Sequence, residues 1–368
     1  MGVYIALTII TICLAAFVKK SDTVQKGVLS RRQVCNWVLL TAIFLLLFAV
    51  SSCRRYVGND YDRYLYFFDL IALGEYVPTE FGFNAVVRLM QFIFGVDTEL
   101  TILALFAFAT ILFMVKALYD QSDDFFFSFT LFMLLTYYFQ TLNTVRYYLA
   151  LAAAFYAAKY AMKKQYVKFI LIILVVATIH KSALIVIPLY ILANRVWKRW
   201  QIIAMCVLAV SGLLFGEYYL KLILLVYPSY QETMFLEGGT SIINIMRCIA
   251  VLVLALLCYK QAIRGNAQNT FYFNLNILAL LLYTCGSFLP EISRIGYYMT
   301  IGHVFLIPSL VNSISKRKVR GFFKVAVIAA GVLYLAIFLR KASAHELRIV
   351  PYQTWVLQHD VDMTEEIY

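Results

Sequence analysis

The sequence predicts an all-α integral membrane protein with about 12 transmembrane helices. The chain of 368 residues is 63% hydrophobic and contains 29 Phe and 27 Tyr, more apolar side chain than a soluble protein of this length can hide. Apolar runs of about 17–20 residues recur along the chain, and that length crosses a hydrocarbon core of about 30 Å. Helices are the expected element, because inside lipid the backbone must satisfy its own hydrogen bonds.

The order of basic and apolar residues at the start of the chain sets the topology. The first apolar run, 2–18, is followed by Lys19 and Lys20 and has no basic residue before it. A cleavable signal peptide has the reverse order, so we interpret this run as a retained span that enters from outside. The basic loop after it is cytoplasmic by the positive-inside rule. The other predicted spans are 35–52, 100–118, 125–140, 145–162, 166–180, 182–194, 201–218, 241–259, 270–288, 295–312 and 321–339.

Basic clusters in later loops extend this topology and place both termini outside. The apolar stretch 81–96 is short and contains Arg88 and Gln91, so we predict an interfacial or re-entrant helix on the outer face. Residues 219–227 are a second candidate for such a helix. The prediction is a single transmembrane domain over 1–368, with extracytoplasmic loops near 53–99 and 219–240 and an outer C-terminal tail over 340–368.

The composition also excludes several classes of function. The seven cysteines are scattered without a CxxC pair, so no metal site is expected from them. The net charge of +12 mostly reflects cytoplasmic loops, and nucleic-acid binding is a poor explanation of it. The sequence has no Walker loop, no HExxH and no GxSxG motif, which leaves no signature of a soluble nucleotide-dependent enzyme or hydrolase.

Lysine and arginine are divided unequally between the two predicted faces. The cytoplasmic side holds 13 Lys and 7 Arg, whereas the outer side holds 3 Lys and 9 Arg. Arginine grips phosphate through two parallel hydrogen bonds and stays charged when desolvated, so the outer enrichment suggests anion binding. Snorkelling to lipid headgroups is the alternative. It is the weaker explanation for Arg146, Arg247 and Arg294, which lie at or just inside the outer ends of predicted helices.

The first outer motif runs from Arg54 to Tyr64. Gly58 permits a tight turn, and Asp60 can hydrogen-bond a sugar hydroxyl or orient an arginine. Tyr61 and Tyr64 offer aromatic faces that could hold a sugar ring. An aromatic belt around an ordinary turn is the alternative. Asp60 and Asp62 have the spacing of a metal-binding DxD pair, but the flanking arginines favour an anion site over a metal site.

The second motif opens a predicted helix with Asn143, Arg146 and Ala150. Asn143 could cap this helix, and Arg146 would lie about one turn inside it, toward the outer aqueous side. Ala150 and the small residues after it allow close helix packing. The alternative role for Arg146 is a structural ion pair within the bundle.

Two further motifs supply candidate bases. His180 and Lys181 lie between two short apolar runs, and a neutral imidazole can take a proton from an attacking hydroxyl near pH 7. Capping a helix or bonding a carbonyl is the alternative role of this His. Glu291 is the second candidate base. It is followed by Arg294 and Tyr298, which share one helical face at i, i+4, and an intrahelical Glu291–Arg294 pair is the alternative there.

These motifs, in this order, resemble the EpsG family of membrane proteins, which is related to Wzy-type polysaccharide polymerases. The resemblance rests on Arg54…Gly58-x-Asp60-Tyr61-x-x-Tyr64, Asn143-x-x-Arg146…Ala150, Ile179-His180-Lys181-Ser182-Ala183-Leu184, Arg294-x-x-x-Tyr298 and the final Pro351-Tyr352. It departs from the family at Tyr147, where many members have Gln.

The resemblance implies assembly of bacterial exopolysaccharide, capsule or O-antigen in the inner membrane, with the active site facing the periplasm or exterior. A growing glycan would move from undecaprenyl diphosphate onto a new lipid-linked repeat unit, without nucleotide, metal or other cofactor. His180 is the first candidate for the base and Glu291 the second. The candidate ligands of the diphosphate are Arg54, Arg146, Arg247 and Arg294, and those of the glycan are Asp60, Tyr61, Tyr64 and Tyr298.

Other functions share much of this pattern. A flippase or exporter of lipid-linked glycan would also need an arginine-lined cavity, but with contacts open to both faces. A glycan ligase resembling the O-antigen ligases would use almost the same chemistry. A membrane O-acyltransferase would need a cytoplasmic histidine, which the predicted topology lacks. The expected partners are the undecaprenyl-diphosphate-linked oligosaccharide, membrane lipid and other polysaccharide-assembly proteins.

Overall fold

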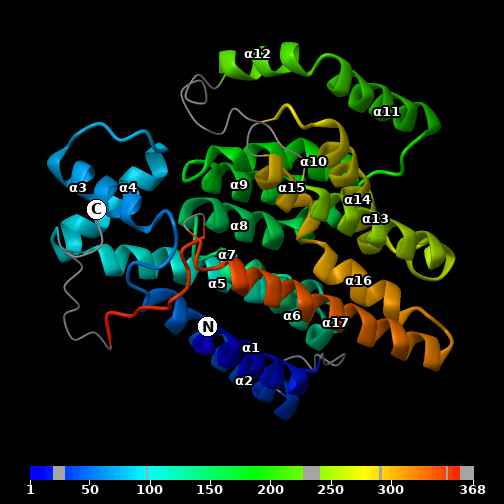
Figure 1. Cartoon of the computed structure of the whole chain (residues 1–368), viewed down its shortest axis with the longest axis horizontal. Helices are drawn as coiled ribbons and strands as arrows, with labels where there is room; N and C mark the ends of the chain where they lie inside the picture. Colours follow the sequence, from blue (N-terminus) through cyan, green and yellow to red (C-terminus); the bar gives the residue numbers. More distant parts are fainter. Residues whose placement is uncertain (20–29, 97, 227–240, 290–291, 345–346, 357–368) are drawn as a thin grey trace. The chain divides into compact units, whose positions relative to one another are not determined.

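The computed structural model describes residues 1–19, 30–96, 98–226, 241–289, 292–344 and 347–356 (Figure 1). Helix makes up 78% of these described residues. Within those ranges the only extended pairing is an isolated antiparallel bridge between Arg54 and Thr354. The all-α prediction is therefore confirmed. The chain forms two compact units, here called the first unit (1–153, 175–181 and 325–368) and the second unit (154–174 and 182–324).

The first unit is built around its N-terminal helices. It contains α1 (Gly2–Phe17), α2 (Arg31–Ser52), α3 (Tyr61–Leu73), α4 (Phe81–Phe94), α5 (Glu99–Gln121), α6 (Phe125–Leu134), α7 (Tyr137–Gln140), the start of α8 (Val145–Met162) and the C-terminal part of α17 (Arg317–Lys341). Helix α2 packs against α5 and α1, α1 packs against α6, and α3 packs against α4. Buried aromatic rings fill these contacts, as where Phe83 of α4 meets Phe68 of α3.

The second unit is organised around one helix, α14. It contains the rest of α8, most of α9 (Tyr166–Ala177), most of η1 (Lys181–Ile185), α10 (Val186–Ala193), α11 (Arg199–Leu214), α12 (Gly216–Val226), α13 (Ile242–Leu257), η4 (Tyr259–Ile263), α14 (Ala267–Cys285), α15 (Ile292–Thr300), α16 (His303–Asn312) and the start of α17. Helix α14 packs against α10, α11, α13, α15 and α16. Its buried Asn274 and Asn276 donate to the carbonyls of Ala193 and Cys248, at 2.9 and 3.1 Å, which ties neighbouring helices to α14.

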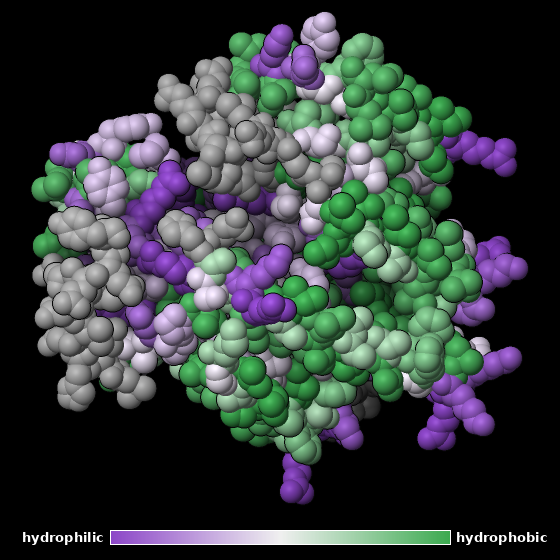
Figure 2. All heavy atoms as spheres, in the orientation of Figure 1, coloured by the Kyte–Doolittle hydropathy of each residue, from purple (hydrophilic) through white to green (hydrophobic). Residues whose placement is uncertain are grey.

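Several helices have the length and character of membrane spans. Within the described residues, α2, α5 and α17 are long and apolar enough to cross a membrane. The number rises to four if α11 and the start of α12, which meet at an angle of 92°, form one span. Large apolar side chains such as Trp37 of α2 and Phe322 of α17 are more than 60% exposed, and hydrophobic residues cover much of the face in Figure 2. Such surfaces fit contact with lipid.

The predicted ranges coincide with helices, but some of those helices are interrupted. The range 145–162 coincides with α8. The predicted run 125–140 divides at Thr136, whose φ of 65° lies in the left-handed region. A helix covers 81–94 of the predicted stretch 81–96, and α12 (Gly216–Val226) overlaps the candidate at 219–227, while the outer-face position of both stays a prediction. Residues 61–73, which we expected to belong to a loop, form α3, and this helix ends at Gly74 with a φ of 76°.

Candidate functional site

A buried carboxylate brings together two of the predicted motifs in the first unit. Glu80 precedes α4, Arg146 lies in the first turn of α8, and His180 follows α9. The Glu80 carboxylate pairs with the Arg146 guanidinium through Oε2 and Nη1. Its other oxygen, Oε1, accepts a hydrogen bond of 3.1 Å from the backbone N–H of Lys181. Residues far apart in the sequence therefore meet at one acidic side chain.

The imidazole of His180 lies beside the same carboxylate. His180 Nδ1 is 3.6 Å from Glu80 Oε1, a distance at which a protonated ring forms an ion pair with it. The side chains of Glu80, Arg146 and His180 are only 14–17% exposed. Tyr147 packs edge-on against the His180 ring, with centroids 5.8 Å apart. The three ionisable side chains form the cluster that we call the Glu80 cluster.

The surroundings keep Glu80 ionised. Burial alone would raise its pKa, but the neighbouring His180, the Arg146 charge and the Lys181 N–H outweigh burial and lower the pKa to about 2. A carboxyl group with such a pKa is an anion at neutral pH and accepts hydrogen bonds without donating a proton. Glu80 can thus orient or stabilise a protonated His180, but it is a poor general acid.

Close backbone contact explains how Glu80 reaches His180. The N–H of Gly82, at the start of α4, donates to the carbonyl of Thr178, at 2.8 Å. A Cβ atom at position 82 would collide with the Thr178 side chain. Glycine at this position lets the start of α4 lie directly on the turn that carries His180. The Arg146 guanidinium also lies over the ring of Phe83, whose centroid is 5.1 Å from the guanidinium carbon.

The Arg54–Tyr64 motif is held by the C-terminal segment. Arg54 forms the bridge with Thr354, the Gly58 N–H donates to the carbonyl of Arg348 at 2.8 Å, and the Tyr352 hydroxyl donates to the carbonyl of Val50 at 3.0 Å. Gly58 has a φ of 102°, and a Cβ atom there would strike the carbonyl of Leu142. The turn predicted at Gly58 is therefore present, and the chain's last described residues support it.

Two of the predicted ligands in this motif have little access to solvent. Arg54 is 2% exposed, and its Nη1 donates to the carbonyl and hydroxyl oxygens of Ser51, at 2.9 and 3.0 Å. Tyr61 is 3% exposed and packs in the core of the first unit. Asp60 is half-buried and precedes α3. In this conformation a ligand of Arg54 or Tyr61 would have to displace the residues that cover them.

Contacts also link this motif to the second one. The Tyr64 hydroxyl accepts a hydrogen bond of 3.3 Å from the Arg146 N–H, although the ring is 3% exposed. Asn143, predicted as a possible cap of α8, accepts the Asn59 N–H on its side-chain oxygen, at 2.8 Å. The first two motifs therefore meet around the start of α8.

The remaining candidate residues lie in the second unit. The Tyr298 hydroxyl is 3.1 Å from the hydroxyl of Ser182, so Ser182 of the third motif contacts the fourth. Arg247 Nη2 donates to the Asn244 amide oxygen at 3.1 Å and to the Thr300 hydroxyl at 3.2 Å. Arg294 is half-buried in α15.

Two other predictions concern Glu291 and metal ions. Glu291, the second candidate base, lies outside the described residues, as do parts of the predicted loop 219–240 and tail 340–368. In the described part of the chain, no three His, Cys, Asp or Glu side chains gather into a group able to hold a metal ion.

Comparison with protein families decides the affiliation. A family model described as EpsG family matches residues 37–354, which include all four motifs and Pro351-Tyr352. The chain belongs to the EpsG family. EpsG is a family of Wzy-type polysaccharide polymerases, and the resemblance inferred from the motifs is thereby confirmed. Comparison with curated proteins and with solved structures finds no match.

Sequence reasoning missed one member of the Glu80 cluster. Glu80 was not among the candidates, although its carboxylate joins Arg146 to His180. A signal was present, because Glu80 is an acidic residue directly before an apolar helix, on the predicted outer face with its many arginines. The ion pair that we considered as the alternative role of Arg146 is present. Its partner is 66 residues away in the sequence, which spacing within one helix could not reveal.

Proposed function

We propose that this EpsG protein extends a glycan at the outer face of the bacterial inner membrane. The growing chain moves from undecaprenyl diphosphate onto the next lipid-linked repeat unit. The family match over residues 37–354 carries the proposal. The Glu80 cluster supports it, because it combines a candidate base with fixed charges of both signs in a largely water-excluded site.

The transfer is a displacement at the anomeric carbon of the donor sugar. An acceptor hydroxyl oxygen forms the new bond to this carbon as the bond to the diphosphate breaks, and the bonding electrons leave with the diphosphate. The hydroxyl proton moves to a base, for which His180 is the first candidate and Glu291 the second. The diphosphate linkage supplies the driving force, so the proposal needs neither a nucleotide nor a metal ion.

Glu80 acts as a positioning residue for His180. As a permanent anion beside Nδ1, it fixes the orientation of the ring and stabilises the imidazolium that forms on proton transfer. Arg146 balances the charge of Glu80 and keeps the carboxylate in place. The Arg146 charge is therefore partly neutralised by Glu80. Arg146 is a positioning residue for Glu80 as well as a candidate diphosphate ligand.

The other arginines are proposed to stabilise charge on the leaving diphosphate. Arg247 and Arg294 are half-buried, and Arg247 Nη2 donates to two neutral oxygens. Charge-assisted contacts of this type strengthen as negative charge develops. Arg54 could join them only after its cover moves, since it is 2% exposed. We keep Asp60, Tyr61, Tyr64 and Tyr298 as proposed glycan contacts. The three tyrosines are buried, so the residues that cover them must also move before a glycan can reach them.

The proposed setting is a single transmembrane domain with about 12 spans, both termini outside, and lipid tails that enter laterally between helices. Several described helices are shorter than a simple span, and adjacent pairs such as α15–α16 would then cross the membrane as broken helices. The active site would face the periplasm or exterior, and other polysaccharide-assembly proteins are the expected partners.

Reconstitution tests this function. Purified full-length protein is incubated with lipid-linked repeat units, with and without a chelator, and the products are separated by size. We expect a ladder of polymers that forms equally with the chelator present. Absence of any product would refute the polymerase, and loss of the ladder on chelation would refute metal independence. A ladder also excludes a pure transporter, and analysis of the acceptor end distinguishes polymerase from ligase.

A further inference from the structure

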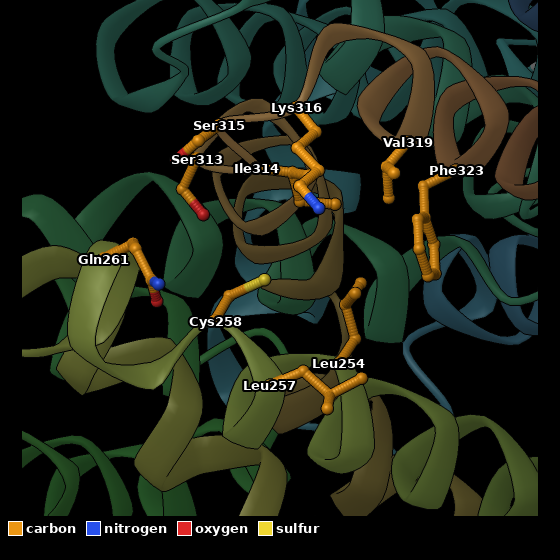
Figure 3. A pocket seen from close by; sticks show the side chains of 10 residues that line it. All are labelled: Leu254, Leu257, Cys258, Gln261, Ser313, Ile314, Ser315, Lys316, Val319 and Phe323. Atoms are coloured by element: carbon orange, nitrogen blue, oxygen red, sulfur yellow. The ribbon is translucent and has the colours of Figure 1, made fainter.

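A pocket lies in the second unit between the end of α13 and the start of α17. Its volume is about 280 Å³. Figure 3 shows the side chains that line it, which come from α13, the start of η4, the turn after α16, and α17. All of them belong to the second unit. The pocket is separate from the candidate residues described above, none of which lines it.

One part of the pocket wall is apolar. Leu254 and Leu257 lie three residues apart on α13, and Val319 and Phe323 lie four residues apart on α17, so each pair lies on one face of its helix. Leu257 is 70% exposed and Val319 is 39% exposed. These side chains offer a surface for a hydrocarbon chain at the edge of the pocket.

The other part of the wall is polar and basic. Lys316, Ser315 and Gln261 supply ammonium, hydroxyl and amide groups, and Figure 3 shows the Lys316 ammonium directed into the space between the helices. The hydroxyl of Ser313 donates to the carbonyl of Leu310, at 2.7 Å, so toward a ligand it can act only as an acceptor. An anion in this pocket would find donors from two different loops.

The two stretches of sequence that form the pocket carry only positive charges. Residues 238–290 and 292–345 contain no Asp or Glu, whereas the two loop regions that meet at the pocket, 258–266 with η4 and 313–320 with the first turn of α17, carry six basic residues. These are Lys260, Arg264, Lys316, Arg317, Lys318 and Arg320. The positive-inside rule assigns both loops to the cytoplasmic side. A positive-inside signal requires only the charges, and it does not explain why they adjoin a pocket whose wall is mostly apolar.

We propose that this pocket binds an anionic phospholipid of the cytoplasmic leaflet. The phosphate of the headgroup contacts Lys316, Ser315 and Gln261, and the start of one acyl chain lies along Leu254, Leu257 and Phe323. Basic pockets between helices on the cytoplasmic side suit such headgroups. The amphiphilic lining selects a lipid over a free phosphate, because an inorganic ion would leave the apolar wall without a partner. The proposal does not depend on the reaction at the outer face.

Cys258 provides a probe inside the pocket. It lines the pocket, is 7% exposed and carries a free thiol, whereas Cys206 of α11 is exposed and does not line it. We would place the full-length protein in nanodiscs of phosphatidylcholine, with or without phosphatidylglycerol, and follow alkylation of both thiols by peptide-resolved mass spectrometry. A third sample contains phosphatidylcholine and inorganic phosphate.

The expected result is slower alkylation of Cys258 with phosphatidylglycerol, at an unchanged rate for Cys206. Lys316→Gln should raise the phosphatidylglycerol fraction needed for half-protection by about five-fold, from the loss of one basic contact at the surface. Lys318→Gln is the matched control, because it removes the same charge from a residue that does not line the pocket.

Three outcomes would overturn the proposal. Equal alkylation of Cys258 in the two lipid compositions would show that no anionic lipid is bound there. Equal effects of Lys316→Gln and Lys318→Gln would show that the lipid is attracted by the general surface charge and not by the pocket. Protection by inorganic phosphate alone would identify an anion site without a lipid. The wild-type comparison remains decisive should either variant fold poorly.

Discussion

Replacing Glu80 by Gln tests the centre of the candidate site. The substitution keeps the shape of the side chain and an oxygen that can accept from the Lys181 N–H, but it removes the negative charge between Arg146 and His180. The guanidinium of Arg146, only 17% exposed, is then left without its carboxylate. We expect the variant to be less stable and less active than the wild type.

The size of the stability effect follows from the ionisation of Glu80. Its pKa falls from an ordinary 4.5 to about 2 in the folded protein, which corresponds to about 3 kcal/mol at about 1.4 kcal/mol per tenfold change in the ionisation constant. Removing one partner of a buried ion pair costs about 3–5 kcal/mol, and the partial exposure of this pair favours the lower value. For a unit of roughly 200 residues, this loss lowers the melting temperature by about 6–12 °C.

Thermal unfolding in detergent at pH 7 measures the effect, with Asp62→Asn as the control. Asp62 pairs with Arg348 at 2.6 Å in the same unit, but this pair is 37–53% exposed, and exposed pairs contribute only about 0–1 kcal/mol. A drop of less than 2 °C for Glu80→Gln, or a drop no larger than that for Asp62→Asn, would refute the reasoning.

The pH dependence supplies a second check. Because folding lowers the pKa of Glu80, its contribution to stability is complete above about pH 4.5 and is lost as the pH falls toward 2. The melting temperatures of wild type and Glu80→Gln should therefore converge with acidification over this range. A difference that persists unchanged at the lowest pH at which both remain folded would mean that the charge of Glu80 is not its cause.

Four other changes test the remaining roles. Arg294→Ala or Arg146→Ala should abolish polymer while single lipid-linked repeats accumulate, as measured by gel separation of the products; normal expression with full-length polymer would contradict the site assignment. His180→Gln should slow polymerisation by about 10²-fold or more if this ring is the base, and a rate within a few-fold of wild type would exclude it. Gly82→Val should destabilise the first unit by more than about 1 kcal/mol through its collision with Thr178, measured by the same unfolding assay.

Helix positions were predictable because apolar runs have the length that a membrane requires. The ranges of α2, α5, α8 and α17 lie close to predicted spans. Breaks within runs were not predictable from hydropathy. Thr136 adopts a left-handed conformation in a stretch that hydropathy alone predicts as one continuous helix. The side chain of Gln140 donates a hydrogen bond to the Thr136 hydroxyl.

The candidate site was predictable only in part, since sequence reasoning finds unusual residues better than it finds their partners. Arg146 and His180 were predicted as site residues because they are polar groups near the ends of predicted helices. Glu80 lies outside every motif, and its importance depends on the close contact between Gly82 and Thr178, which no local pattern reports. The burial of side chains was also not predictable from the sequence. Tyr61 and Tyr64 are residue types common at sugar-binding surfaces, but each is only 3% exposed.

The charges of the Glu80 cluster suggest why an acidic residue is present in a site proposed to hold a diphosphate. With Glu80 ionised and His180 neutral, the acidic and basic side chains of the cluster sum to zero. Proton transfer to His180 then creates one positive charge, adjacent to Glu80 and close to the departing anion. Without Glu80 the cluster would already carry the charge of Arg146, and His180 would be harder to protonate. In the proposed reaction, the carboxylate would weaken the binding of an anion by Arg146 but would make His180 a better base, as proton transfer to this ring requires.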